Sequence, residues 1–174
     1  MDGDFLLIHR MKRGEDDALE VFVRKYYPLI LKYCRYHTAD DGYAEDLTQE
    51  TFERFFRSLH TYQHSGKAAN YLYVIAGNLC KDRYRKKEEL NLEELPEAGE
   101  SPLEMVDERM DMERALGKLP DELREVIILH YFQELKLKEI AGILNVGLPL
   151  VKYRVRKAKE LLGIYLKAGC ERKD

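Results

Sequence analysis

The stretch LKEIAGILNVGLPLVKYRVRKA, residues 137–158, determines the fold class that we expect for the C-terminal part of this chain. Its apolar residues recur at threes and fours on both sides of Asn145-Val146-Gly147, which is typical of two amphipathic helices joined by a turn. The inward stripes are Leu137, Ile140, Ala141 and Leu144 in the first helix and Val151, Val155, Ala158 and Leu162 in the second. The stretch therefore predicts a helix-turn-helix.

The second helix of this motif has a basic outward face. When its apolar stripe faces inward, the helical period turns Lys152, Tyr153, Arg156 and Lys157 outward, where a recognition helix meets the major groove. A purely structural helical hairpin is the alternative, because short helix pairs are common. The net charge of +5 over residues 114–174 favours the DNA-binding interpretation.

Charge is divided unevenly along the 174 residues, whose formal net charge is −3. Residues 1–87 carry +2, residues 88–113 carry −10, and residues 114–174 carry +5. The acidic block contains Pro96 and Pro102 and few large apolar residues, which indicates a solvated, flexible linker. We therefore predict two small helical domains, 1–87 and 114–174, joined by an acidic flexible linker, 88–113.

The N-terminal part shows the helical period without any competing strand pattern, so the chain is predicted to be all-α. The segment 43–59 places apolar residues on one stripe and polar ones on another, namely Asp46, Gln49, Glu50 and Glu53. We expect this helix to bury one face and display an acidic one. By composition alone, that acidic face is either a solvated surface or a partner site.

A further helix is predicted over residues 67–87, after a loop at 61–66. Its outward stripe includes Asn70, Asn78, Lys81 and Arg85. Four tyrosines lie close by in the sequence, namely Tyr62, Tyr71, Tyr73 and Tyr84. Basic residues at a helix end can simply complement the helix dipole. The mixture of cations and aromatic rings favours a surface for unpaired nucleic acid, because such rings stack on bases.

The sequence contains no signature of a catalytic or metal centre. Cys34, Cys80 and Cys170 are far apart, and no GxxxxGK, GxGxxG, GxSxG or HExxH motif occurs. The sequence has no membrane-spanning apolar run, and its first residues are acidic, unlike a signal peptide. We therefore expect a cytoplasmic protein that is not an enzyme and uses no cofactor or metal.

Two sets of motifs resemble bacterial RNA polymerase sigma factors of the extracytoplasmic-function (ECF) group. The sequences AEDLTQETF at 44–52 and YLYVIAGNL at 71–79 resemble region 2 of that family. Four short segments resemble region 4: Leu119-Pro120, Arg124-Glu125-Val126-Ile127, Glu139-Ile140-Ala141 and Val151-Lys152-Tyr153-Arg154. The resemblance covers roughly residues 5–166 and leaves no room for the intermediate domain of larger sigma factors.

The resemblance implies a non-catalytic subunit that directs core RNA polymerase to the promoters of a stress or envelope-responsive regulon. It implies contacts with the clamp helices and the flap of the polymerase, and it assigns the clamp contact to Asp46, Gln49, Glu50 and Glu53. It places the minus-10 element against Tyr62, Asn70, Tyr71, Asn78, Lys81 and Arg85. It also implies an anti-sigma factor, in some members membrane-bound, as a further partner.

The resemblance assigns the minus-35 duplex to Leu148, Pro149, Lys152, Tyr153, Arg156 and Lys157. Lys152, Arg156 and Lys157 suit phosphates, whereas the apolar residues and Tyr153 suit base edges. Arg154 leans toward the inner face, so we expect it either to pair with Glu139 or to contact DNA.

Two other functions fit parts of the same pattern. A stand-alone helix-turn-helix regulator would bind duplex DNA specifically without polymerase. A helical adaptor would bind only protein, and its binding would not depend on the outward bases of the last helix.

Overall fold

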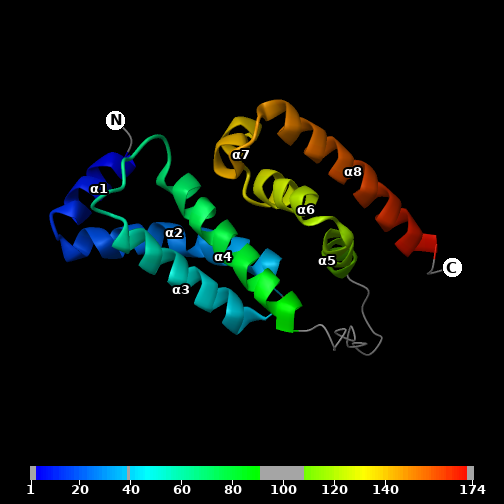
Figure 1. The fold of residues 1–174 in the computed structure, drawn as a ribbon, viewed down its shortest axis with the longest axis horizontal. Helices are drawn as coiled ribbons and strands as arrows, with labels where there is room; N and C mark the ends of the chain where they lie inside the picture. Colours follow the sequence, from blue (N-terminus) through cyan, green and yellow to red (C-terminus); the bar gives the residue numbers. More distant parts are fainter. Residues whose placement is uncertain (1–2, 39, 91–107, 172–174) are drawn as a thin grey trace. The chain divides into compact units, whose positions relative to one another are not determined.

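The computed structural model describes residues 3–38, 40–90 and 108–171, and every regular element in these ranges is a helix (Figure 1). The all-α class predicted from the apolar spacing is therefore confirmed for the described residues. The chain divides into two compact units, Met1–Leu90 and Asn91–Asp174.

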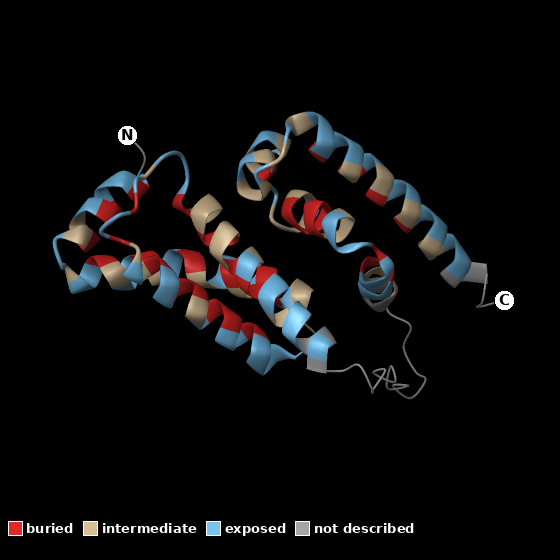
Figure 2. Cartoon of the chain, viewed as in Figure 1, coloured by how far each residue is buried: buried red, intermediate tan, exposed pale blue. Residues whose placement is uncertain are grey.

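Unit 1 is a bundle of four helices. They are α1 (Gly3–Lys12), α2 (Asp16–His37), α3 (Asp41–Arg57) and α4 (Ala68–Leu90). Helices α2, α3 and α4 pack against one another, α1 packs on α2, and the buried positions lie on the facing sides (Figure 2). The core is rich in aromatic rings, with Phe22 stacked on Phe55 at 4.8 Å between centroids and Tyr33 edge-on to Tyr73 at 5.4 Å. These contacts hold α3 and α4 against α2.

Helix α3 begins and ends at residues that satisfy its terminal backbone groups. At its start, the Asp40 carboxylate accepts a hydrogen bond from the Tyr43 N–H at 3.2 Å. At its end, the Ser58 hydroxyl donates to the Phe55 carbonyl at 2.9 Å. The helix therefore begins and ends two residues earlier than the predicted segment 43–59.

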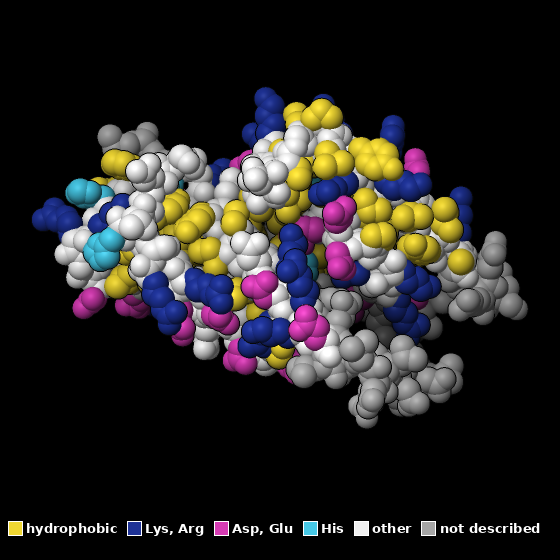
Figure 3. Space-filling model, viewed as in Figure 1, with side chains coloured by type: hydrophobic (Ala, Val, Ile, Leu, Met, Phe, Trp, Pro, Cys, Tyr) yellow, Lys and Arg dark blue, Asp and Glu magenta, His cyan; other side chains and the backbone are white. Residues whose placement is uncertain are grey.

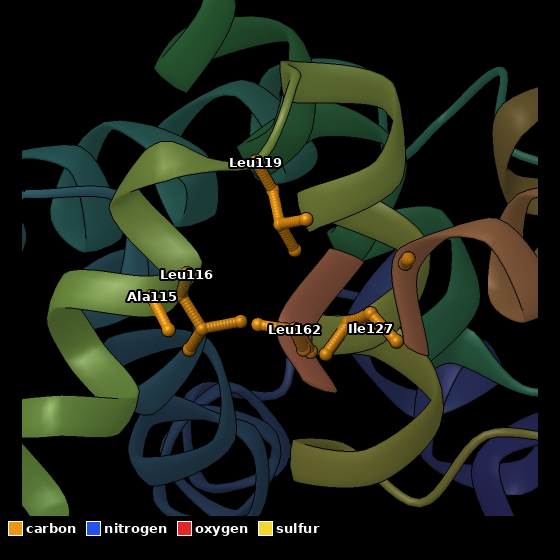
Figure 4. Packing of buried hydrophobic residues seen from close by; sticks show 6 residues of the cluster. Ala115, Leu116, Leu119, Ile127 and Leu162 are labelled. Carbon is orange, nitrogen blue, oxygen red and sulfur yellow. The ribbon is translucent and has the colours of Figure 1, made fainter. Parts of the chain in front are cut away.

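Unit 2 packs three helices and one π-helical turn around a long C-terminal helix. Its elements are α5 (Glu108–Lys118), α6 (Asp121–Ile127), the turn η1 (Ile128–Phe132), α7 (Leu137–Leu144) and α8 (Leu148–Glu171). Helices α5, α6 and α7 each contact α8. Buried side chains of α5, α6 and α8 form one cluster, with Leu116, Ile127 and Leu162 among its members (Figure 4).

The segment predicted as a linker, 88–113, overlaps two helices. Helix α4 continues to Leu90 and α5 begins at Glu108. Helix α5 begins before the predicted boundary because Met112 already packs against the apolar cluster of unit 2. Residues 91–107, which make up the rest of the predicted acidic linker, lie outside the described residues. The domain boundaries therefore stay a prediction.

Candidate functional site

The first candidate surface is the outer side of α3. We define the acidic face as the four side chains predicted to bind a partner: Asp46, Gln49, Glu50 and Glu53. Asp46, Gln49 and Glu53 are exposed and Glu50 is half-buried. Glu50 pairs with Arg54 at 2.8 Å, and Glu53 approaches Arg57 at 4.0 Å. Both pairs are exposed contacts within one helix, so each contributes little to stability.

The acidic face is held outward by the buried side of the same helix. Leu47, Phe52 and Phe55 lie in the core of unit 1. Thr48 and Thr51 are also fully buried, and their hydroxyls donate to backbone carbonyls one turn earlier, each at 2.7 Å. Because the buried hydroxyls are hydrogen-bonded, they impose no desolvation penalty that would favour rotating the helix.

The second candidate surface lies where the chain leaves α3 and enters α4. The sequence predicts that Tyr62 offers its ring to an unpaired base. In the structure this ring is stacked on the Tyr71 ring, with 4.9 Å between the ring centroids, and packs edge-on against the Phe55 ring, with 5.3 Å between the centroids. Tyr62 is only 9% exposed, so the expected open ring is not present. The ring is buried because the sequence places it over the aromatic core, and Tyr71, which is half-buried, forms the outer layer.

The prediction of a ring open to an unpaired base is also wrong for Tyr73. It is 2% exposed and packs against Tyr33, so its ring is also closed to a base. Burial raises the pKa of the Tyr73 hydroxyl well above its ordinary range, so the hydroxyl stays neutral. The side chain of Tyr84 lies outside the described residues.

The exposed side of α4 carries the predicted polar and basic residues. We define the α4 stripe as Asn70, Asn78, Lys81 and Arg85. Asn78, Lys81 and Arg85 are exposed, and Asn70 is half-buried. The Asn70 Oδ1 atom is buried and meets no hydrogen-bond donor within the described part of the chain. Arg83 lies on a different side of α4 from this stripe. Its guanidinium carbon lies over the Tyr43 ring of α3, 3.9 Å from the ring centroid.

The third candidate surface is the outward face of α8. The turn before it is confirmed, with Asn145 in the left-handed conformation at φ 53° and ψ 47°. The inward stripe is also confirmed, since Val151 and Ala158 are fully buried and Val155 is 7% exposed. We define the α8 outward face as Leu148, Pro149, Lys152, Tyr153, Arg156 and Lys157. Its members are exposed except Leu148 and Lys157, which are half-buried.

Figure 3 shows Lys and Arg side chains in dark blue projecting along one side of α8. Arg156 lies over the ring of Tyr153 at 5.7 Å from its centroid, and Lys157 approaches Glu160 at 3.8 Å. These contacts are surface contacts of small energy. The cations therefore stay available to phosphate groups.

Arg154 does not form the pairing with Glu139 that was one of its two roles expected from the sequence. Its guanidinium pairs with Glu122 of α6 at 3.2 Å, and its side chain is only 14% exposed. Glu139 instead accepts a hydrogen bond from the Lys136 N–H at 2.9 Å and so caps α7. Arg154 thus ties α8 to α6, a contact between positions far apart in the sequence that no local pattern signals.

The sequence patterns give no role to α1, yet two of its charged side chains reach the two ends of the loop between α3 and α4. Lys12 contacts Tyr62 and Asp4 contacts Ala68, across 50 and 64 sequence positions. Periodicity describes a single helix, so it cannot reveal contacts of this kind. They bear on the second candidate surface, because both end at its loop.

Neither a metal site nor a membrane span is found among the described residues. No group of His, Cys, Asp or Glu side chains within those ranges is arranged to hold a metal ion. None of the helices traced in the described ranges is long and apolar enough to cross a bilayer. The candidate functional features remain the three charged surfaces on α3, on α4 with the loop before it, and on α8.

Comparison with known proteins gives two family matches and a close relative. The family "Sigma-70 region 2" matches residues 22–89, and the family "Sigma-70, region 4" matches residues 109–162. The chain is 31% identical over 172 residues to the ECF RNA polymerase sigma factor SigW of Bacillus subtilis (strain 168). That similarity covers 89% of this chain and 92% of the relative.

Two solved structures share the fold. CnrH, in complex with the cytosolic domain of CnrY, superposes with a TM-score of 0.76 at 22% identity, over 96% of this chain and 99% of that one. The sigma factor RpoE in complex with the anti-sigma factor NepR, from Bartonella quintana, gives 0.69 at 20% identity, over 85% and 96%.

Proposed function

This chain belongs to the sigma-70 family as an ECF RNA polymerase sigma factor that directs transcription initiation, and from this premise we propose that three surfaces divide that work. The acidic face of α3 binds core RNA polymerase. The loop before α4, together with the α4 stripe, binds the opened minus-10 strand. The α8 outward face binds the minus-35 duplex. Proteins of this family are in general regulatory subunits and not catalysts.

The acidic face suits a cationic partner on the polymerase, for which we propose the clamp helices. Glu50 and Glu53 already pair with arginines of their own helix, but these pairs are exposed and exchange at little cost for intermolecular ones. Asp46 and Gln49 add exposed polar groups one turn earlier. Three carboxylates on one face steer a cationic partner surface toward it and fix its register.

For the minus-10 element, we propose that Tyr71 and the α4 stripe act directly and that Tyr62 acts from beneath. Extracting a base from the stack costs a few kcal/mol, and stacking on an aromatic ring returns about 1–3 kcal/mol per base. Tyr71 is the outer ring of the pair, and the Tyr62 ring is stacked beneath it with 4.9 Å between the ring centroids. Lys81 and Arg85 are exposed along α4 and suit the phosphates of the displaced strand.

For the minus-35 element, the buried apolar stripe of α8 is the observation that carries the proposal. It turns Lys152 and Arg156 to solvent, and it leaves Pro149 and Tyr153 exposed near the start of the helix. In a recognition helix the N-terminal residues contact base edges and the cations neutralise phosphates. We assign Arg154 a structural role instead, because it is paired and largely buried.

We propose one further property by relation to the similar proteins. The RpoE structure is a complex with an anti-sigma factor, and we propose that a protein of this class regulates this chain as well. The flap contact, the cytoplasmic location and the stress or envelope-responsive regulon stay predictions of the sequence analysis.

The decisive experiment is in vitro transcription with core RNA polymerase over a genomic library, followed by mapping of start sites. We expect discrete start sites only when core enzyme and this protein are both present, with shared sequence elements upstream of them. Start sites identical to those of core enzyme alone would refute the function. Tight, specific duplex binding by the protein without polymerase would instead support the stand-alone regulator.

A further inference from the structure

We propose that α1 is a positioning element for promoter opening, because its side chains Lys12 and Asp4 hold the two ends of the loop 63–67. This inference rests on the proposed minus-10 role of that loop. Helix α1 precedes residues 22–89, the part that matches the region 2 family, so its role is not part of that match.

The first contact holds the start of the loop. The Lys12 ammonium donates a hydrogen bond to the backbone carbonyl of Tyr62 at 2.6 Å. Tyr62 is also stacked on Tyr71, so one residue links α1, the loop and the ring proposed to meet a base. A charged donor on a half-buried carbonyl makes one of the stronger kinds of hydrogen bond in proteins.

The second contact holds the end of the loop. Asp4 is 2% exposed, and its carboxylate accepts the backbone N–H of Ala68 at 3.4 Å. Ala68 is the first residue of α4, and its N–H belongs to the helix terminus that lacks intrahelical acceptors. The same carboxylate accepts hydrogen bonds from Lys25, at 2.7 Å, and from the Tyr26 hydroxyl, so it is anchored to α2.

Between these two anchors the loop faces solvent. Gln63, Ser65, Gly66 and Lys67 are exposed, and His64 is half-buried with Nδ1 at 3.1 Å from the Tyr62 hydroxyl. Gly66 has a φ of +81°, a left-handed backbone conformation that residues with a side chain rarely adopt. The loop therefore has a defined path and two held ends, and most of its polar side chains are exposed to solvent.

Holding the ends raises affinity for the strand without any contact between α1 and DNA. A loop that is ordered before binding loses less conformational entropy when it binds. The anchors can transmit to DNA binding at most the stabilisation that they give to the ordered loop. Because the hydrogen bond between Lys12 and Tyr62 is only partly buried, the net value of an ordinary hydrogen bond applies rather than the larger value for charged groups, which corresponds to roughly three- to tenfold in affinity.

The test uses the full-length variant Lys12→Met, which keeps an unbranched side chain of nearly the same length and removes its charge and donor. Arg10→Gln is the matched control, because Arg10 lies on the same helix and pairs with Glu15 and Asp17 rather than with the loop. Lys12→Arg is the conservative variant. Asp4→Asn tests the other anchor. Because Asp4 is buried, weaker DNA binding by this variant would not result from the loss of a direct contact between Asp4 and DNA.

Two measurements are made on each variant. Hydrogen–deuterium exchange on the protein without DNA reports the backbone amides of residues 63–68. Fluorescence anisotropy reports binding of the holoenzyme to a single-stranded oligonucleotide, the nontemplate minus-10 strand of a promoter mapped by the transcription experiment. We expect faster exchange in the loop and roughly three- to tenfold weaker oligonucleotide binding for Lys12→Met and Asp4→Asn, unchanged core affinity, and recovery in Lys12→Arg.

The outcomes separate this inference from the function on which it rests. Unchanged loop exchange and oligonucleotide binding in Lys12→Met would overturn the inference, as would an equal loss in Arg10→Gln. A parallel loss of core affinity would also overturn it, because it would reveal a merely structural role. Failure of the wild-type holoenzyme to bind the oligonucleotide would count against the proposed function, independently of the exchange result.

Discussion

Two arginines on α8, two positions apart, are expected to respond in opposite ways to truncation. Arg156 is exposed on the outward face, whereas Arg154 is 14% exposed and paired with Glu122. Each phosphate contact contributes about 0.9 to the slope of log K against log salt concentration. If Arg156 makes one such contact, Arg156→Ala lowers the slope by about 0.9, so the loss in affinity between 50 and 200 mM salt shrinks by roughly 3.5-fold.

Arg154→Ala should leave that slope unchanged and destabilise the domain. The lost pair and the lost packing of the side-chain stem amount to about 1 kcal/mol, which corresponds to about 4–8 °C in the midpoint of a domain of this size. Binding of a labelled minus-35 duplex to preassembled holoenzyme over a salt series, with thermal unfolding of each free protein, separates the two effects. A lowered slope in Arg154→Ala with an unchanged slope in Arg156→Ala would refute the assigned orientation of α8.

Three further predictions address the other surfaces and the core. Reversing both Asp46 and Glu50 to Lys should abolish core polymerase binding in an anisotropy titration. Thermal unfolding should shift little, because Asp46 is exposed and half-buried Glu50 loses only its surface pair with Arg54; retained binding would exclude the acidic face as the docking surface. Burial by itself raises the pKa of Asp4, but the hydrogen bond and the charge of Lys25, with other hydrogen bonds, outweigh it and hold the pKa below its ordinary value. Asp4 therefore stabilises the fold above the unfolded pKa of about 3.9, and this contribution is lost as pH falls through the lower folded value; the Asp4→Asn variant should flatten the acid limb of a stability-versus-pH curve, and an unaltered limb would contradict the account. Ile140 is fully buried in unit 2, so Ile140→Ala should lower the free energy of unfolding of this unit by about 2–5 kcal/mol. The variant should lose minus-35 binding and keep core polymerase binding through the acidic face. A loss of both activities together would show that the two units do not fold independently.

The elements that depend on local spacing were predictable. The bounds of α7, the turn at Asn145 and the buried stripe of α8 all agree with the apolar period, because a helix repeats its own geometry and needs no distant information. The end of α4 and the start of α5 differ from the predicted linker, since composition alone does not reveal that Met112 has a cluster to pack against. The roles of the predicted site residues stay predictions that the proposed experiments test.

The sequence by itself determined the helical class, the three charged faces and the family resemblance, because each is written in the spacing and type of neighbouring residues. Only the tertiary structure decided that the Tyr62 ring is closed under Tyr71, that Arg154 pairs with Glu122, and that α1 reaches the loop before α4. These contacts join positions far apart in the chain, and which partners meet depends on how whole helices pack against one another. Packing depends on the shapes of many side chains together, which no local pattern records.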